Sequence, residues 1–157
     1  MDAAVAVHPR FKLAKTLQWS TLRREKLMLV VPSKLRNKKP LSILSSMPLI
    51  RYDRKTEGGR LADEYIRHQG IACKVQFELD GIEQIAKLVA EGLGVAVLPD
   101  WPVTGSVNSR LARLPLPEPC PERLVGLTWF GSSKRAALVA AFLKVATEVS
   151  SKKVGRR

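Results

Sequence analysis

The middle of the chain has the most regular alternation of apolar and polar positions. Its apolar or alternating runs predict three β-strands, and its residues at helical spacing predict two helices. In chain order these elements are residues 48–52, 60–69, 74–79, 81–92 and 95–98. The order strand, helix, strand, helix, strand builds a parallel sheet with right-handed crossovers. The pattern therefore predicts an α/β fold.

The ends of the two predicted helices carry residues that favour starts and stops. Asp80 is a favourable N-cap for the second helix, and Glu83 supplies the partner of a capping-box-like pair. Gly70 and Gly92 are expected to end the first and second helices. Gly94 follows at a helix-to-strand junction, so this glycine pair indicates a C-cap and a close backbone approach. A dinucleotide site would need the glycines at a strand-to-helix turn.

The two ends of the chain have a less regular α/β pattern. Extended segments, a short helical turn and a long final helix capped by Ser133 are predicted there. Their bounds are 3–7, 17–22, 27–31, 40–46, 111–116, 124–130 and 134–149. These strands outnumber the helices able to cover them. The ends therefore look like a piece of a larger domain.

Most of the large aromatic side chains are expected in the core. These are Trp19, Phe77, Trp129 and Phe142, the last of them on an apolar stripe along the final helix.

The formal charge of +13 is unevenly distributed along the chain. Residues 8–39 hold ten basic side chains against one acidic, and residues 123–157 hold eight against one. Residues 51–100 hold seven basic and nine acidic side chains. The basic ends are interpreted as a solvated loop and a frayed tail, or alternatively as a module that binds nucleic acid non-specifically. No recognition helix is predicted in the first basic stretch.

Motifs for catalysis, cofactor binding and metal binding are missing from the sequence. There is no Gly-x-Ser-x-Gly elbow, no phosphate loop and no His-Glu-x-x-His. The only sulfur and imidazole ligands are Cys73, Cys120, His8 and His68, which lack the spacing of a zinc site. We expect no enzyme activity, no cofactor and no metal, and two inert thiols.

No segment directs the chain to a membrane or to secretion. No apolar run approaches the ~20 residues that span a bilayer. The N-terminus lacks a basic region and has an acidic residue, Asp2, at its second position. The chain is expected to be cytoplasmic and to have no membrane partner.

Recognition chemistry gathers where the predicted parallel strands end. The loop 53–59 and the Asp80-Gly81 turn both follow such strands, so they are expected to meet at one cleft. Arg54, Lys55 and Thr56 offer two cations and a hydroxyl that suit a carboxylate. The N-terminus of the helix 81–92 also favours an anion. The alternative interpretation is a solvated loop and an Asp80 that only caps its helix.

Three runs in this region carry a family resemblance. They are Pro48-Leu-Ile-Arg-Tyr-Asp53, Phe77-Glu-Leu-Asp-Gly-Ile-Glu83 and Leu88-Val-Ala-Glu-Gly-Leu-Gly-Val-Ala-Val-Leu-Pro99. Together they resemble the effector-binding domain of LysR-type transcriptional regulators, and the last run is the most specific. The flanking strands and the final helix follow the same order, so the resemblance covers nearly the whole chain.

The resemblance implies a fold of periplasmic-binding-protein type 2, with one complete α/β subdomain and part of a second. The complete subdomain is expected at residues 32–110. The partial one combines residues 1–31 and 111–150, and residues 151–157 form a basic tail. The family's winged helix-turn-helix and the opening of its first subdomain are missing from this sequence. The chain is therefore expected to be an N-terminally truncated member.

The resemblance also implies the function and the site. Small effectors, often carboxylates, bind between the two subdomains of such regulators and control transcription. The residues expected to face the effector are Tyr52, Asp53, Arg54, Lys55, Thr56, Asp80, Gly81 and His8. The expected partners are an anionic effector and either a second copy or full-length relatives, with DNA bound only through the missing domain. A truncated remnant that only binds a partner is the remaining alternative.

Overall fold

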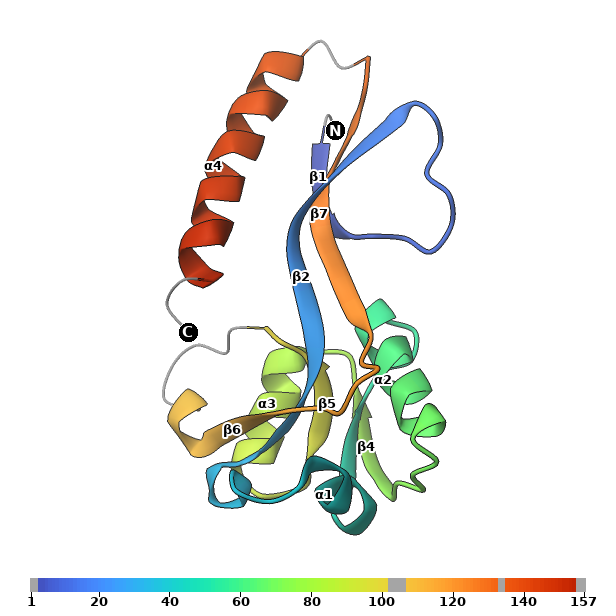
Figure 1. Cartoon of the computed structure of the whole chain (residues 1–157), viewed down its shortest axis with the longest axis vertical. Helices are drawn as coiled ribbons and strands as arrows, with labels where there is room; N and C mark the ends of the chain where they lie inside the picture. Colours follow the sequence, from blue (N-terminus) through green and yellow to red (C-terminus); the bar gives the residue numbers. More distant parts are fainter. Residues whose placement is uncertain (1–2, 102–106, 133–134, 155–157) are drawn as a thin grey trace. The chain divides into compact units, whose positions relative to one another are not determined.

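The chain forms two compact units in the computed structural model, which describes residues 3–101, 107–132 and 135–154 (Figure 1). Unit 1 combines Met1–Arg24 with Leu124–Arg157, and unit 2 is the continuous segment Glu25–Arg123. The polypeptide passes from one unit to the other twice, once in strand β2 (Leu17–Pro32) and once in strand β7 (Glu122–Phe130).

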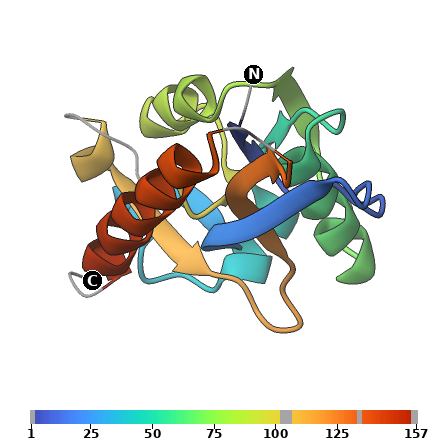
Figure 2. The ribbon, with the colours of Figure 1, turned by 90° about the horizontal axis from the view of Figure 1, so that it is seen from above.

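Unit 1 is a small antiparallel sheet with one long helix. Strand β1 (Ala3–Val7) pairs with β7, and β7 lies next to β2. Helix α4 (Ala136–Val154) runs beside the sheet (Figures 1 and 2). Among the described residues, the buried apolar side chains of unit 1 are Leu127 and Val139. This unit therefore has very little core.

Unit 2 is built on the second half of β2. Strands β5 (Ala96–Pro99) and β6 (Leu111–Pro115) both pair with it in antiparallel fashion. Strand β3 (Leu49–Tyr52) pairs in parallel with β4 (Val75–Leu79), and a parallel bridge joins Leu49 to Val95 beside β5. The helices are α1 (Pro40–Ser46), α2 (Glu57–His68) and α3 (Ile82–Ala90), with short 3₁₀ turns η1 (Ser33–Leu35) and η2 (Asn108–Arg110). The predicted strand–helix–strand–helix–strand order is confirmed.

The core of unit 2 has two layers, one on each face of the strands. Alternate residues of a strand point to opposite faces, so Val97 joins the layer that α1 and α2 cover, while Leu98 joins the layer that α3 covers. Figure 1 shows α2 and α3 on opposite sides of β5. In β2, Leu29 and Val30 divide in the same way. The apolar runs of the sequence are therefore buried on both faces, as expected for central strands.

The structure joins two predicted strands into one. Residues 17–22 and 27–31 are parts of the continuous β2, because the charged segment between them keeps the two-residue alternation. Glu25 points inward and is 1% exposed. Arg123 of β7 donates to its Oε2 from Nε at 2.7 Å and lies within 2.6 Å of it through Nη2. A buried carboxylate needs such a partner, and the sequence does not show that one exists 98 positions away.

Several predicted helix ends are corrected. Gly81, not Asp80, is the N-cap of α3, and no side chain caps this helix, so the predicted pairing of Asp80 with Glu83 is wrong. Helix α2 begins at Glu57 because Thr56 caps it, which shortens the predicted loop 53–59. The predicted stops are confirmed, since Gly70 and Gly92 have positive φ values of 65° and 79°.

Two of the four aromatic side chains expected in the core are exposed. Phe77 lies on β4, an edge strand with both faces largely in solvent, and Phe142 of α4 is 49% exposed. Trp19 and Trp129 are partly buried. The predicted cap Ser133 and residues 155–157 of the predicted tail lie outside the described residues, whereas residues 151–154 belong to α4.

The described helices include none that combines the length and the apolar character needed to cross a bilayer.

Candidate functional site

The candidate site lies in unit 2, where the parallel strands β3 and β4 end. Strand β3 continues into Asp53–Thr56 and then α2, and β4 continues into Asp80-Gly81 and then α3. The Asp53 N–H donates to the Leu79 carbonyl at 2.8 Å, which holds the two strand ends together. The cavity there has a volume of about 460 Å³ and is lined by Asp53, Lys55, Glu78, Leu79 and Asp80.

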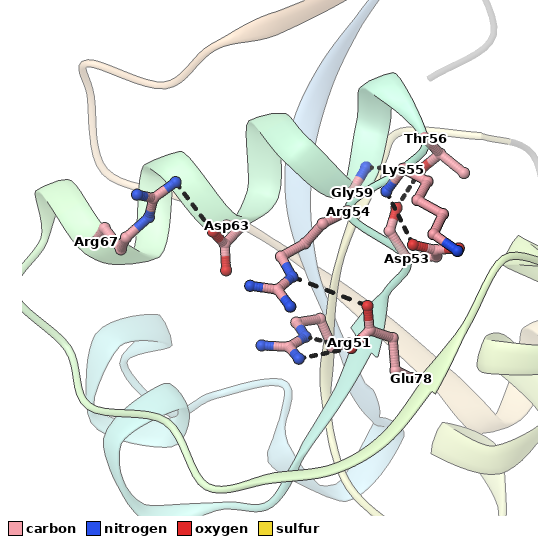
Figure 3. Close-up of polar contacts among 9 residues, drawn as sticks. All are labelled: Arg51, Asp53, Arg54, Lys55, Thr56, Gly59, Asp63, Arg67 and Glu78. Carbon is pink, nitrogen blue, oxygen red and sulfur yellow. Dashed lines mark hydrogen bonds and ion pairs between the residues drawn. The ribbon is translucent and has the colours of Figure 1, made fainter.

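Local hydrogen bonds fix the loop after β3 (Figure 3). Asp53 Oδ1 accepts from the Lys55 N–H at 2.8 Å, and the Asp53 carbonyl accepts from the Thr56 N–H at 2.9 Å. The Thr56 hydroxyl donates to the same carbonyl at 2.7 Å and accepts from the Gly59 N–H at 3.0 Å. Its proton is therefore used within the loop, and its oxygen caps α2.

Gly59 allows this loop to lie directly against the first turn of α2. A Cβ placed on Gly59 would collide with the backbone oxygens of Asp53 and Tyr52. The requirement is one of space for the backbone, so any side chain here would push the loop away. Sequence reasoning missed this residue because it placed residues 57–59 in a loop. Thr56 followed by Glu57 was the available signal, since both residues favour a helix start.

An ion pair between the two strands fixes the wall of the site. Arg51 donates to Glu78 Oε2 from Nε at 3.0 Å and from Nη2 at 2.5 Å. Arg54 Nε lies 3.9 Å from Glu78 Oε1. The hydrogen bond from Arg51 is the main cause that lowers the pKa of Glu78, and the charges of both arginines lower it further. Glu78 therefore stays ionised at neutral pH.

A second hollow of about 350 Å³ adjoins this wall and shares Asp53, Lys55 and Glu78 with the first. Its other cations are all held by carboxylates. Arg60 pairs with Glu57 and Glu64, Arg67 pairs with Asp63 at 3.0 Å, and Arg54 pairs with Glu78. Within the described part of the chain, Lys55 is the lining cation whose side chain forms no ion pair. Lys55 is also the cation common to both hollows.

Comparison with known proteins identifies the family of this domain. A family model described as LysR substrate binding domain matches residues 1–151. The chain belongs to the LysR substrate-binding domain family. The resemblance seen in the sequence is thus confirmed, and so is the fold of periplasmic-binding-protein type 2. No protein of curated function has a sequence that matches this one.

Solved structures of other LysR domains share the fold. The C-terminal domain of a probable LysR regulator from Rhodococcus sp. RHA1 has a TM-score of 0.73 and 21% identity, over 94% of this chain and 74% of that one. The Synechocystis CcmR regulatory domain in complex with 2-PG has a TM-score of 0.72 and 18% identity, over 95% and 73%. The effector-binding domain of QuiR in complex with shikimate has a TM-score of 0.67 and 17% identity, over 96% and 72%.

The structure of this LysR domain brings together some of the predicted site residues. Asp53, Lys55 and Asp80 line one cavity, and Arg54 lines the adjoining hollow. Tyr52 is 7% exposed and belongs to the core layer under α3. The Tyr52 ring therefore supports the site from within unit 2.

The remaining predicted residues have other surroundings. Gly81 caps α3 with its backbone. His8 belongs to unit 1, where its N–H donates to the Leu124 carbonyl at 2.8 Å and its ring meets Trp19 edge to face at 4.7 Å. No group of three His, Cys, Asp or Glu side chains is placed to hold a metal ion among residues 3–101, 107–132 and 135–154.

Proposed function

We propose that this LysR domain senses a small hydroxylated organic acid in the cavity where β3 and β4 end. The observation that carries the proposal is the position of Lys55. Lys55 lines both hollows and its side chain forms no ion pair within the described residues, whereas the neighbouring arginines are held by carboxylates. A cation without an ion-pair partner at a cavity is suited to receive the carboxylate of a ligand.

The rest of the lining suits the hydroxyl groups of such a ligand. Asp53 and Asp80 contribute carboxylate oxygens to the cavity, and these accept hydrogen bonds from hydroxyl donors. They would repel a ligand that is anionic throughout, so one acid group with several hydroxyls fits better. The first turn of α2 begins two residues after Lys55 and adds the partial positive charge of a helix N-terminus to this part of the chain. The neighbour QuiR supports this class of ligand, because its structure holds shikimate.

Membership of the LysR family extends the proposal to the whole protein. We infer that residues 32–110 act as one effector-binding subdomain, with residues 1–31 and 111–150 contributing to the other, and that His8 adds to the site from the latter. In this view the domain works in the cytoplasm as part of an oligomer of its own chain or with full-length relatives. In that assembly, DNA would be contacted by the winged helix-turn-helix domain that regulators of this family carry. The effector changes the regulator only if its affinity differs between two arrangements of that assembly.

Titration calorimetry with shikimate, other hydroxy acids and their uncharged amides tests the proposal. We expect one or more acids to bind and the matching amides to bind at least about tenfold more weakly, because a hydrogen bond to a charged group contributes about 1.5–3 kcal/mol. Lys55→Ala should weaken binding of the acid by a similar factor. Lys87→Ala, which removes an exposed cation of α3, is the matched control and should leave affinity unchanged.

Two results would overturn the proposal. Amides that bind as tightly as the acids would exclude recognition of a carboxylate. An acid that binds equally well to wild type and Lys55→Ala would place its site elsewhere.

A further inference from the structure

The charges that line the cavity proposed for the effector do not balance. Its charged residues are three carboxylates, Asp53, Glu78 and Asp80, and one cation, Lys55. A ligand that displaces water from this cavity takes over part of the solvation of these groups, so its own charges must complement theirs. The charges that already have a partner within the chain therefore decide what the ligand must supply.

Glu78 is neutralised by the chain itself. Arg51 lies opposite Glu78 in the parallel ladder of β3 and β4, and it donates to Oε2 from Nε at 3.0 Å and from Nη2 at 2.5 Å. Arg54 Nε lies 3.9 Å from Oε1 of the same carboxylate. Glu78 therefore belongs to the wall of the cavity and needs no positive charge from a ligand.

Asp80 has no such partner. It comes directly after β4 and directly before Gly81, the N-cap of α3. An aspartate at the start of a helix commonly caps it, but no side chain caps α3. Within the described part of the chain, the Asp80 carboxylate forms neither an ion pair nor a hydrogen bond. Helix capping therefore does not explain the carboxylate at this edge of the cavity.

Asp53 uses one of its two carboxylate oxygens within the loop. Oδ1 accepts from the Lys55 N–H at 2.8 Å (Figure 3). A single neutral donor does not neutralise the carboxylate, and Asp53 forms no ion pair among residues 3–101, 107–132 and 135–154. Its second oxygen remains able to accept from a ligand.

The two unpaired aspartates are neighbours across the ends of β3 and β4. Tyr52 pairs with Leu79 in the ladder, and Asp53 and Asp80 each follow one member of this pair. Neighbouring strands lie about 4.8 Å apart, which lets one small cationic group contact carboxylates on both. The cavity thus combines one cation with a pair of carboxylates at adjacent strand ends.

A ligand with an acid group alone leaves these carboxylates without positive charge. Its carboxylate pairs with Lys55 but adds a further negative charge near Asp53 and Asp80. Hydroxyl groups supply donors to the two aspartates and no charge. An ammonium group supplies both, because it carries one positive charge and three N–H donors, and hydrogen bonds that involve ionised groups are the strong ones.

We infer that the effector is a small amino acid, with its carboxylate on Lys55 and its ammonium group against Asp53 and Asp80. The inference rests on the proposed function, since it keeps that site and the role of Lys55, and it names the group that the two aspartates bind. The same aspartates disfavour a ligand with a second acid group, because like charges repel.

Matched pairs of ligands in an NMR chemical-shift titration at about pH 6 test the inference. The pairs are serine with glycerate, alanine with lactate, and phenylalanine with phenyllactate, and each differs only in an ammonium or a hydroxyl group at C2. Amide signals of residues 53–56 and 80–82 report binding at this cavity. We expect at least one amino acid to bind about tenfold more tightly than its hydroxy acid, because a hydrogen bond to a charged group contributes strongly.

Asp80→Asn should move the two ligand classes in opposite directions. It removes the negative charge and keeps the size of the side chain, so the amino acid should bind about tenfold more weakly while the hydroxy acid binds equally or more tightly. Glu83→Gln removes an exposed carboxylate of α3 that does not line the cavity, so this matched control should change neither affinity. The amide spectrum of each variant checks its fold.

A second variant removes the other aspartate charge without disturbing the loop. Asp53→Asn keeps an oxygen that can accept from the Lys55 N–H, and it should also weaken the amino acid and spare the hydroxy acid. Lys55→Ala should weaken both ligand classes, since it removes the partner of the carboxylate that they share.

The outcomes separate this inference from the proposed function. Hydroxy acids that shift the cavity signals as strongly as their amino acids would overturn the inference and leave the proposed function standing. An amino acid that loses affinity in Asp80→Asn but not in Lys55→Ala would instead count against the role of Lys55 in both. Equal effects of Asp80→Asn and Glu83→Gln, or no shift from any amino acid, would overturn the inference.

Discussion

The two units of this LysR domain differ in how they bury apolar side chains. Of the twenty-four buried apolar side chains, unit 2 holds twenty-two and unit 1 holds two among the described residues. Of the ten large apolar side chains that are exposed in the described part of the chain, seven belong to unit 1. Unit 2 therefore has the burial that stabilises a domain, whereas unit 1 exposes much of the apolar surface it has.

The surfaces of the two units differ in a related way. The cavity that we propose for the effector lies in unit 2, is lined mostly by charged residues and adjoins the buried core, which suits a small ligand held by a few placed charges. Unit 1 instead exposes apolar side chains in its described part and carries a large excess of basic residues. Unit 2 carries fifteen basic and twelve acidic residues, so most of the net charge of the chain belongs to unit 1.

The largest expected effect tests the ion pair that lies where both connecting strands enter unit 2. Arg123→Ala removes the guanidinium that binds the buried Glu25, and breaking such a pair destabilises a protein by about 3–5 kcal/mol. Urea unfolding measures the loss. Lys26→Ala removes the exposed pair with Glu118 and is the control, with little change expected. Equal losses in the two variants would contradict the difference in burial.

The same leucine truncation in each unit tests the contrast directly. Leu29→Ala empties a fully buried position in unit 2 and should cost about 2–5 kcal/mol of unfolding free energy. Leu138→Ala removes an exposed side chain in unit 1 and should change it by no more than about 0.5 kcal/mol. A large loss from Leu138→Ala would show that the α4 stripe is covered in solution, and the contrast between the units would fail.

An intermediate effect is expected at the loop that borders the cavity proposed for the effector. Thr56→Ala removes the hydroxyl that caps α2 and should lower the unfolding free energy by about 1 kcal/mol. Thr56→Ser keeps the hydroxyl and should restore most of the stability. If serine does not rescue the variant, the threonine methyl group is responsible and the capping account is wrong.

The smallest effect is a pH dependence across the β3–β4 pair. Arg51 lowers the pKa of Glu78 in the folded state, so the pair stabilises unit 2 at neutral pH. This stabilisation is present above the unfolded carboxyl pKa of about 4.3 and is lost as the pH falls through the folded value. The difference in unfolding free energy between wild type and Glu78→Gln should therefore shrink below about pH 4. Arg51→Gln should remove the same dependence, and an unchanged difference down to pH 3 would contradict this origin.

The sequence predicted the middle of unit 2 well because local pattern and burial agree there. Strands β3, β4 and β5 and helices α2 and α3 were found within a few residues, since buried strands and amphipathic helices have different apolar periods. Neighbouring parallel strands end at the same edge of a sheet, and this rule was enough to predict that Asp53 and Asp80 lie close together. The LysR family was recognised from the same region.

Other parts of the site could not be read from single residues. Thr56 looked like a hydroxyl available to a ligand, yet its bonds to Asp53 and Gly59 use it inside the loop. Arg54 and Lys55 are adjacent cations in the sequence, and only the position of Glu78 on the neighbouring strand distinguishes them. In each case a side chain could bind either a neighbouring residue or a ligand, and the sequence does not show which of the two it binds.

The sequence by itself determined the family, the order of elements in the middle of unit 2, and the meeting of Asp53 and Asp80 where two parallel strands end. Tertiary structure alone decided that β2 is continuous, because the buried Glu25 depends on Arg123, 98 positions along the chain. It also decided which apolar face of α4 lies outward. Leu138 and Val139 each begin an apolar stripe along the helix, and the spacing of apolar residues does not show which stripe the sheet covers.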